Sequence, residues 1–529
     1  MIQRLKTIEK HFSVPKAAAI VGFFTLLSRI VGLVRDRLFA SSFGAGDTLD
    51  IYYAAFRIPD LVFNLLVLGT LSVAFIPIFT ELLITDKEKA YKIANSILNF
   101  SFLLMSALCL ILIFFAQPLT HLLVPGFEGQ KFADTVILTR ILLLSPIIFT
   151  VSSIFSSILN SQKKFIIANL APVMYNLGII FGLLVLYPKF GLYGLGWGVI
   201  IGAGLHLLVQ IPEAVHYGYI WQSVMDLKDP AIKKVLGLFL PRVLGVDNSQ
   251  VSLLIGSIVG SVLISGSIAV FNLANNLQAV PLGVFAISTA IAMFPLLSEF
   301  YAKKNEEDFA KSLSKAISQI LFFMVPFTIL LLLFRAHLVR LAFGAGKFNW
   351  DDTILTFNTL GMFSLSLFAQ GLSPLLARAF YARQDTKTPV IIGVATMVIN
   401  AVLAYFLGRR FGAAGMAGGF SIAAIFNAAV LYFILRFRIS RQISQATLEN
   451  FDDTIFISLT KVIIASLFMG LTGYAALYIL APLVDTHTTL GLLIQSSLAF
   501  ILAGGIFYAV GSYLGLPQLK GLFAKKAGN

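Results

Sequence analysis

The chain is built of long apolar runs separated by short polar segments, from about residue 16 to residue 515. A helix needs roughly 20 apolar residues to cross a bilayer, and fourteen runs reach that length. They cover residues 16–42, 50–82, 93–117, 132–159, 165–187, 191–215, 235–263, 267–300, 312–335, 353–381, 389–408, 413–435, 456–483 and 488–515. The pattern therefore predicts an all-α polytopic membrane protein with about 14 transmembrane helices.

The composition supports this class. Hydrophobic residues make up 58% of the 529 residues and charged residues 12%, whereas an ordinary soluble domain has about 25% charged residues. A soluble protein of this size could not bury that much apolar surface, so a soluble enzyme is excluded. The single cysteine, Cys109, also excludes structural disulfides.

Lysine and arginine alternate between the two sides of the predicted spans. The N-terminal tail, the even-numbered loops and the C-terminus hold 25 of them, and the odd-numbered loops hold 7. Because basic loops stay on the cytoplasmic side, the even loops and both termini are expected to be cytoplasmic, with residues 1–15 as a retained tail. The net charge of +14 then indicates contact with anionic membrane lipids rather than with nucleic acid.

The first twelve spans contain an internal repeat. AFIPIFTE (74–81) matches AMFPLLSE (292–299) at an offset of 218, and GLYGLGWGV (191–199) matches GAAGMAGGF (412–420) at an offset of 221. Two copies of six spans have the same orientation, as in transporters with a site between two lobes. We therefore expect an N-lobe over 16–228, a C-lobe over 229–440, and two further spans with a cytoplasmic tail over 441–529.

Several arginines lie inside predicted spans, where a charge costs roughly 2.5–3.5 kcal/mol at the bilayer centre and usually faces a cavity. Arg29 and Arg242 occupy equivalent positions of the repeat, in LLSRIVG and FLPRVLG, and Arg57 lies in the second span. Arginine suits phosphate because its planar fork donates two hydrogen bonds. These residues predict a cationic cavity for an anionic, phosphate-bearing amphiphile.

Two further charges accompany them. Helical periodicity returns Asp36 to the face of Arg29 and places Arg35 about 120° away, so an Arg29–Asp36 pair is expected. For Arg35 the alternative to a place in the cavity is a side chain that snorkels towards the membrane interface. Asp247 follows Arg242 as a counter-charge or an ion ligand.

No nucleotide-binding or metalloprotease motif is present in the sequence, so we expect no enzymatic activity, cofactor or metal. An ion gradient, with the ion unidentified, or the membrane potential would then supply the energy.

The chain resembles the lipid II flippases of the MurJ (MviN) family, in the MOP superfamily that also holds MATE drug exporters. The resemblance covers about residues 15–515 and rests on SRIVGLVRD (28–36), FGAG (43–46), AFRIPD (55–60), GTLSVAFIPI (69–78), PGF (125–127) and RQDTKTPV (383–390).

The resemblance implies a flippase of the bacterial inner membrane for peptidoglycan synthesis. Such a flippase moves undecaprenyl-pyrophosphoryl disaccharide-pentapeptide to the outer leaflet by alternating access, and proteins of cell-wall synthesis are possible partners. By the same resemblance Arg29 and Arg35 match functional arginines, Asp36 and Asp50 match acidic residues, and Arg57 matches a basic position of the second span.

The eighth span departs from the family, because the stretch from Ala274 to Pro281 lacks the arginine that relatives carry there. Either Arg242 with the neutral residues Asn275, Asn276 and Gln278 rebuilds the site, or the substrate has changed. The alternatives are therefore a flippase for another polyprenyl-linked glycan, a MATE-like exporter, or a membrane scaffold of the same fold that transports nothing. We favour the rebuilt site.

Overall fold

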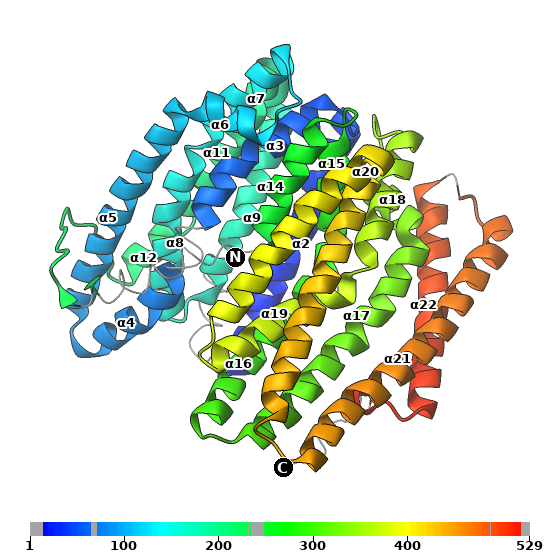
Figure 1. The fold of residues 1–529 in the computed structure, drawn as a ribbon. Coiled ribbons are helices and arrows are strands. Elements are labelled where there is room, and N and C mark those ends of the chain that lie inside the picture. The colour runs from blue at the N-terminus through cyan, green and yellow to red at the C-terminus, as the bar shows by residue number, and fades with distance from the viewer. Residues whose placement is uncertain (1–13, 65–70, 231, 234–247, 487, 520–529) are drawn as a thin grey trace. The chain divides into compact units, whose positions relative to one another are not determined.

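The computed structural model describes residues 14–64, 71–230, 232–233, 248–486 and 488–519, and over these ranges the chain forms helices and connections with no strand (Figure 1). Their contacts group the chain into two compact units, Met1–Gly266 and Ser267–Asn529. The prediction of an all-α fold is confirmed.

Unit 1 is a helical bundle with its main core between α4, α5 and α8. In that core the rings of Phe75 and Phe79 stack 4.9 Å apart, and the side chain of Asp86 caps α5 by accepting from the backbone N–H of Lys89. The elements of unit 1 are α2 (Val14–Phe43), α3 (Asp47–Phe63), α4 (Leu71–Thr85), α5 (Lys87–Phe114), α6 (Ala116–Leu123), α7 (Gly129–Leu142), α8 (Ser145–Ser161), α9 (Phe165–Phe181), the π-helical turn η3 (Gly182–Leu186), α10 (Tyr187–Phe190), α11 (Leu192–Leu208), α12 (Ile211–His216) and α14 (Asn248–Ser261).

Unit 2 repeats this type of packing around its own core, where the rings of Phe285 and Phe323 stack 4.3 Å apart. Asn305 caps the long α17 through the backbone N–H of Asp308. Its elements are α15 (Ser267–Pro281), the π-helical turn η4 (Leu282–Ile287), α16 (Ser288–Ala302), α17 (Glu306–Phe343), α18 (Trp350–Ser364), α19 (Leu367–Ala382), α20 (Lys387–Ser440), α21 (Gln445–Leu480), the 3-10 turn η5 (Ala481–Leu483) and α22 (Thr489–Tyr513).

Within the described ranges, nine helices are long and apolar enough to cross a membrane, and ten if the bent pair α18–α19 is one span. One of the nine is α20, which carries two predicted spans joined at Gly412. The described parts of the predicted spans 16–42, 50–82 and 235–263 form α2, α3–α4 and α14, and residues 65–70 and 235–247 of these spans lie outside the described residues. The arrangement is consistent with fourteen spans, and that count stays a prediction.

Backbone conformations support the internal repeat. Lys163 and Gln384 follow helices in the left-handed region, with φ of 61° and 60°. Gly191 and Gly412 both have positive φ, 57° and 63°, and both pairs are 221 residues apart. The predicted lobe boundary after residue 228 rests on this repeat and stays a prediction. By contacts, α14 packs with unit 1.

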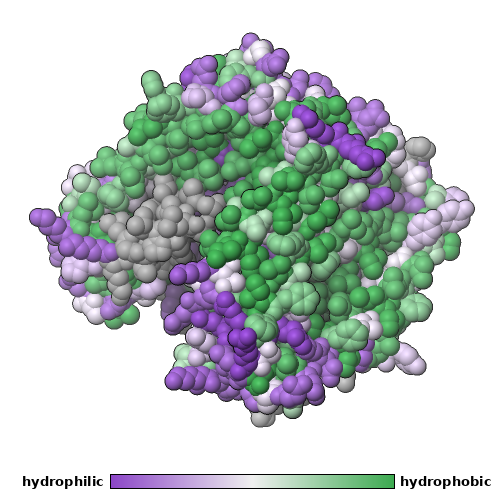
Figure 2. All heavy atoms as spheres, in the orientation of Figure 1, coloured by the Kyte–Doolittle hydropathy of each residue, from purple (hydrophilic) through white to green (hydrophobic). Residues whose placement is uncertain are grey.

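The surfaces of the long helices are those of a membrane protein. Figure 2 shows hydrophobic residues along α20 and hydrophilic residues near its two ends. Val394, Val398 and Phe406 of α20 and Phe468 and Leu471 of α21 are all exposed. So many large apolar side chains on the surface of these helices indicate that this surface contacts the hydrocarbon of a membrane and not water.

Candidate functional site

Arg35 is the best-defined charged residue of the predicted site. It lies on α2, where its guanidinium donates to Asp36 Oδ1 from Nε at 3.0 Å and from Nη2 at 2.7 Å. Its Nη1 donates to Asn176 Oδ1 of α9 at 2.9 Å. Asn176 is itself fixed by donating to the Pro172 carbonyl oxygen. The arginine is thus oriented by a carboxylate and by an amide from a neighbouring helix.

Asp36 has a partner that helical periodicity did not predict. Its carboxylate accepts two hydrogen bonds from the adjacent Arg35, and the Arg29–Asp36 pair stays a prediction. The long arginine side chain can fold back over one residue, which an argument from backbone angles alone omits. Arg29, six residues before Arg35 on α2, has an exposed side chain.

Arg57 lies on α3 and is buried, 6% exposed. Its Nε donates to Ser257 Oγ of α14 at 3.0 Å, and Ser257 also donates to the Leu253 carbonyl oxygen. Both residues belong to unit 1, so Arg57 contributes to the packing of α14 against α3.

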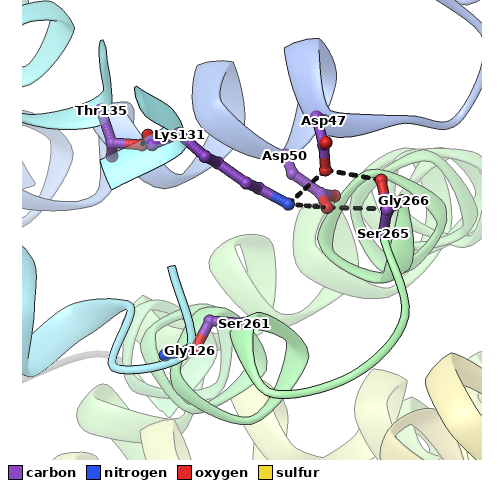
Figure 3. Close-up of polar contacts among 8 residues, drawn as sticks. All are labelled: Asp47, Asp50, Gly126, Lys131, Thr135, Ser261, Ser265 and Gly266. Atoms are coloured by element: carbon purple, nitrogen blue, oxygen red, sulfur yellow. Dashed lines mark hydrogen bonds and ion pairs between the residues drawn. The ribbon is translucent and has the colours of Figure 1, made fainter. Parts of the chain in front are cut away.

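Asp50 belongs to a compact polar cluster at the start of α3 (Figure 3). Its buried carboxylate accepts from Lys131 Nζ at 3.2 Å and from the Gly266 N–H at 2.7 Å. Asp47, one turn earlier, accepts from Lys131 Nζ at 2.5 Å and from Ser265 Oγ at 2.6 Å. Both carboxylates lie in the first turn of a helix, where the helix dipole favours negative charge. The cluster ties α7 and the segment that precedes α15 to the start of α3.

The cluster constrains both charge and backbone. Partial burial alone would raise the pKa of Asp47, but the bonds from Lys131 and Ser265 outweigh it and lower that pKa. Gly266 has φ of +87°, and a Cβ at this position would lie 1.9 Å from the Ala45 carbonyl oxygen. Only glycine fits here.

The predicted amides of unit 2 lie on α15. Gln278 is buried, donates to Asn275 Oδ1 at 3.1 Å, and accepts from Gln370 Nε2 of α19 at 2.9 Å. Gln370 Nε2 also donates to Ser366 Oγ at 2.9 Å. Asn275 and Asn276 are half-buried. Gln278 therefore supports Asn275 and joins α15 to α19.

Arg242 and Asp247 lie outside the described residues. Among the residues that are described, no group of three or more His, Cys, Asp or Glu side chains could hold a metal ion. In the described part of unit 1, Arg35 and Lys131 are hydrogen-bonded to carboxylates.

Four side-chain partners of the predicted residues were missed by sequence reasoning: Lys131, Asn176, Ser257 and Gln370. Lys131 was counted only as a loop charge. Asn176 and Ser257 are polar residues within apolar helices, and that pattern alone could have marked them.

Comparisons with known proteins agree with this architecture. The sequence profile described as lipid II flippase MurJ matches residues 39–492. A protein of Buchnera aphidicola named "Probable lipid II flippase MurJ" is 30% identical over 467 residues, which is 87% of this chain and 90% of the relative. The lipid II flippase MurJ of Burkholderia cenocepacia is 28% identical over 432 residues, 80% of this chain and 84% of the relative.

Solved structures show the same fold. A lipid II flippase MurJ in an inward closed conformation aligns with a TM-score of 0.72 and 25% identity, covering 93% of this chain and 99% of that one. An inward-facing multidrug resistance MATE family transporter of the MOP superfamily aligns with a TM-score of 0.64 and 18% identity, covering 78% of this chain and 95% of that one. The second likeness concerns the fold alone.

Proposed function

The chain belongs to the MurJ family of lipid II flippases, and from this premise we propose that it moves lipid II across the bacterial inner membrane for peptidoglycan synthesis. The observation that carries the proposal is the family match over residues 39–492. Arg35, half-buried, and Arg57, buried, support it, because charges within apolar membrane helices usually mark a binding site or pathway.

In this proposal the pyrophosphate of the substrate binds Arg29, Arg35 and Arg242, with Arg57 near the entrance. Arg35 is suited to this role because Asp36 and Asn176 fix its plane before a ligand arrives. An oriented guanidinium loses less freedom when it forms a bidentate pair with phosphate.

The neutral and acidic residues would support the arginines. Asn275 and Asn276 donate amide hydrogens to phosphate or sugar, and Gln278 holds Asn275. Asp50 fixes Lys131 and the segment before α15. Asp247 would be the counter-charge of Arg242.

The cycle we propose is alternating access, driven by an ion gradient or the membrane potential, with both termini in the cytoplasm and no catalytic step. The polyprenyl tail would stay in the lipid while the sugars and peptide pass through a wet cavity. Proteins of cell-wall synthesis would be partners at the loops.

Complementation of a bacterial strain depleted of its own lipid II flippase tests this function. Wild type should restore growth, whereas Arg29→Ala and Arg242→Ala should not, at equal membrane levels on a blot. Arg409→Ala is the matched control, because Arg409 is an exposed arginine at the middle of α20. Growth with Arg242→Ala would remove Arg242 from the site and leave the function intact.

A second measurement separates an incompatible host from a different function. Purified wild type is reconstituted in vesicles with labelled lipid II, and the label that becomes accessible from outside is followed. No transfer would contradict the proposal, and it would favour another polyprenyl-linked cargo or a scaffold.

A further inference from the structure

Helix α3 carries two carboxylates whose surroundings differ. Asp50, near the start of the helix, accepts hydrogen bonds from Lys131 and from the Gly266 N–H (Figure 3). Asp60, ten residues later, is half-buried, and its carboxylate accepts no hydrogen bond and forms no ion pair with any residue that the structure describes. A charged carboxylate without such a partner is costly inside a predicted span, and groups of this kind usually serve a substrate or ion pathway.

The face of α3 that holds Asp60 keeps accessible surface. Tyr53, Phe56, Asp60 and Asn64 recur every three or four residues, so they lie on one face of the helix, and all four are half-buried. Asn64 Nδ2 donates at 2.8 Å to the main-chain oxygen of Asp60 and not to its carboxylate. Neither carboxylate oxygen is among the unbonded polar atoms that are fully buried, so water can reach the group.

Two arginines act on Asp60 through space. Arg57, one turn earlier on α3, and Arg35 of α2 both interact with the carboxylate electrostatically, and the phenol of Tyr175 on α9 interacts with it as well. Both guanidiniums are held by other groups. Arg57 Nε donates to Ser257 Oγ of α14 at 3.0 Å, and Arg35 donates to its partners on α2 and α9. The arginines therefore attract Asp60 from beyond ion-pair distance.

The other helices that pack on α3 add no comparable charge at Asp60. Helices α8 and α14 contain no titratable side chain over their described lengths. On α7, Lys131 and Asp134 lie in the first two turns, where Lys131 bonds the start of α3, and Arg140 is exposed. On α2, the carboxylate of Asp36 is bound by an arginine of its own helix. The two arginines therefore govern the charge state of Asp60.

The binding of an anion reverses the effect of these arginines on Asp60. Without a ligand, their positive charges favour the ionised carboxylate. A phosphate bound at Arg35 cancels that field and places negative charge beside Asp60, which favours the protonated carboxyl. A metal ion is a poor alternative ligand, because in the described part of the chain no group of three or more His, Cys, Asp or Glu side chains could hold one.

We propose that Asp60 is a proton-binding site linked to the anion site. It takes up a proton from water when the phosphate of the substrate binds Arg35, and it releases the proton when the phosphate leaves. The anion in this scheme rests on the proposed function, whereas the proton site rests on the unbonded carboxylate itself. Because linkage is reciprocal, a lower pH should tighten the binding of the anion.

The test is isothermal titration calorimetry of the purified full-length protein in detergent, with lipid II as the ligand, in two buffers that differ in ionisation enthalpy. The difference between the two heats gives the number of protons taken up. We expect wild type to take up at least about half a proton per bound lipid II at pH 7, and its affinity to fall by up to about tenfold from pH 7 to pH 8. Asp60→Asn should bind lipid II without proton uptake and with the same affinity at both pH values.

Asp134→Asn is the matched control, because Asp134 of α7 is also half-buried but accepts from Gln130 Nε2 at 2.8 Å. This variant should keep the wild-type proton uptake, and the melting temperature of each variant checks that it folds. No uptake by wild type, or equal uptake by wild type and Asp60→Asn, would overturn the proposal.

Inorganic pyrophosphate is the second ligand, and it separates the proton site from the identity of the substrate. If pyrophosphate binds with an uptake that Asp60→Asn loses, while lipid II does not bind, the proton site stands and the proposed function fails. Binding of neither ligand by wild type would overturn both.

Discussion

At the scale of single residues, the guanidinium of Arg35 has five N–H groups. Three donate to Asp36 and Asn176 within the described part of the chain. Two are left for a ligand, which is what a bidentate contact with phosphate requires. Asp36 and Asn176 therefore orient the guanidinium of Arg35 and leave two of its N–H groups for a ligand.

Arg35→Lys should consequently lower transport about tenfold or more, because an ammonium keeps the charge but cannot bond Asp36, Asn176 and phosphate in one plane. The measurement is the rate of labelled lipid II transfer in vesicles. Arg409→Lys, at an exposed position of α20, should keep the wild-type rate. Wild-type transfer by Arg35→Lys would show that only the charge matters.

Asp385, between α19 and α20, predicts a pH effect on stability. Burial alone would raise the pKa of Asp385, but bonds from Thr388 and Arg438 lower it from 3.8 to about 2. A carboxyl with a lowered folded pKa stabilises the fold above pH 3.8 and loses that effect as the pH falls towards about 2. Asp385→Asn, which keeps an oxygen that can accept from the Thr388 N–H, should melt a few degrees below wild type at pH 7.

The check is thermal unfolding in detergent at several pH values. The difference between wild type and Asp385→Asn should shrink below about pH 4. A difference that stays constant down to pH 3 would assign the effect to packing and not to charge.

At the scale of elements, α9 and α11 approach each other through glycine. A Cβ on Gly178 would lie 2.2 Å from Gly202 Cα, and one on Gly182 would lie 2.5 Å from Gly198 Cα. The spacing of four on both helices is the small-residue pattern that lets membrane helices pack closely. These distances assign Gly198 and Gly202 of the sixth predicted span, 191–215, to close helix packing.

Gly202→Leu should therefore destabilise unit 1 by about 1–3 kcal/mol, the usual cost of overpacking. Gly204→Leu is its control, because a Cβ at Gly204 on the same helix has no neighbour within 4 Å. The yield of monodisperse protein and the melting temperature should fall for Gly202→Leu alone. Equal loss in both variants would point to helix propensity instead of packing.

The sequence predicted where the helices lie better than it predicted the residues at which they begin and end. Hydropathy reports the part of a helix that meets lipid, so the run 312–335 marks only the middle of α17, which extends from Glu306 to Phe343. The additional turns have polar faces and an Asn305 cap. Kinks such as the break between α18 and α19 depend on packing against neighbours, which hydropathy does not record.

The site was predictable to the extent that a charge stands out in an apolar run. Arg35 and Asp36 were found for that reason, whereas Asp50 was found only through the family resemblance. Lys131 was missed, since its partner Asp50 is 81 residues away and only the fold brings them together. Neutral partners such as Asn176 give a weaker signal, because many polar side chains in helices only bond their own backbone.

At the scale of the whole molecule, the distribution of lysine and arginine predicts the topology, and the chain is well suited to testing it. Its only cysteine, Cys109, is buried, so Cys109→Ala gives a cysteine-free background. Gln130→Cys, exposed at the start of α7 in an odd-numbered loop, should react with a membrane-impermeant maleimide on intact cells. Lys303→Cys, exposed after α16 in an even-numbered loop, should react only after permeabilisation.

Both positions are exposed, so a difference in labelling reports the side of the membrane and not accessibility within the fold. The two positions also lie in different units, so each copy of the repeat is tested separately. Labelling of both cysteines from outside would mean an even number of spans between them, whereas the prediction places five there. The count of six spans in each copy of the repeat would then be wrong, and the proposed relation between Arg29 and Arg242 would lose its basis.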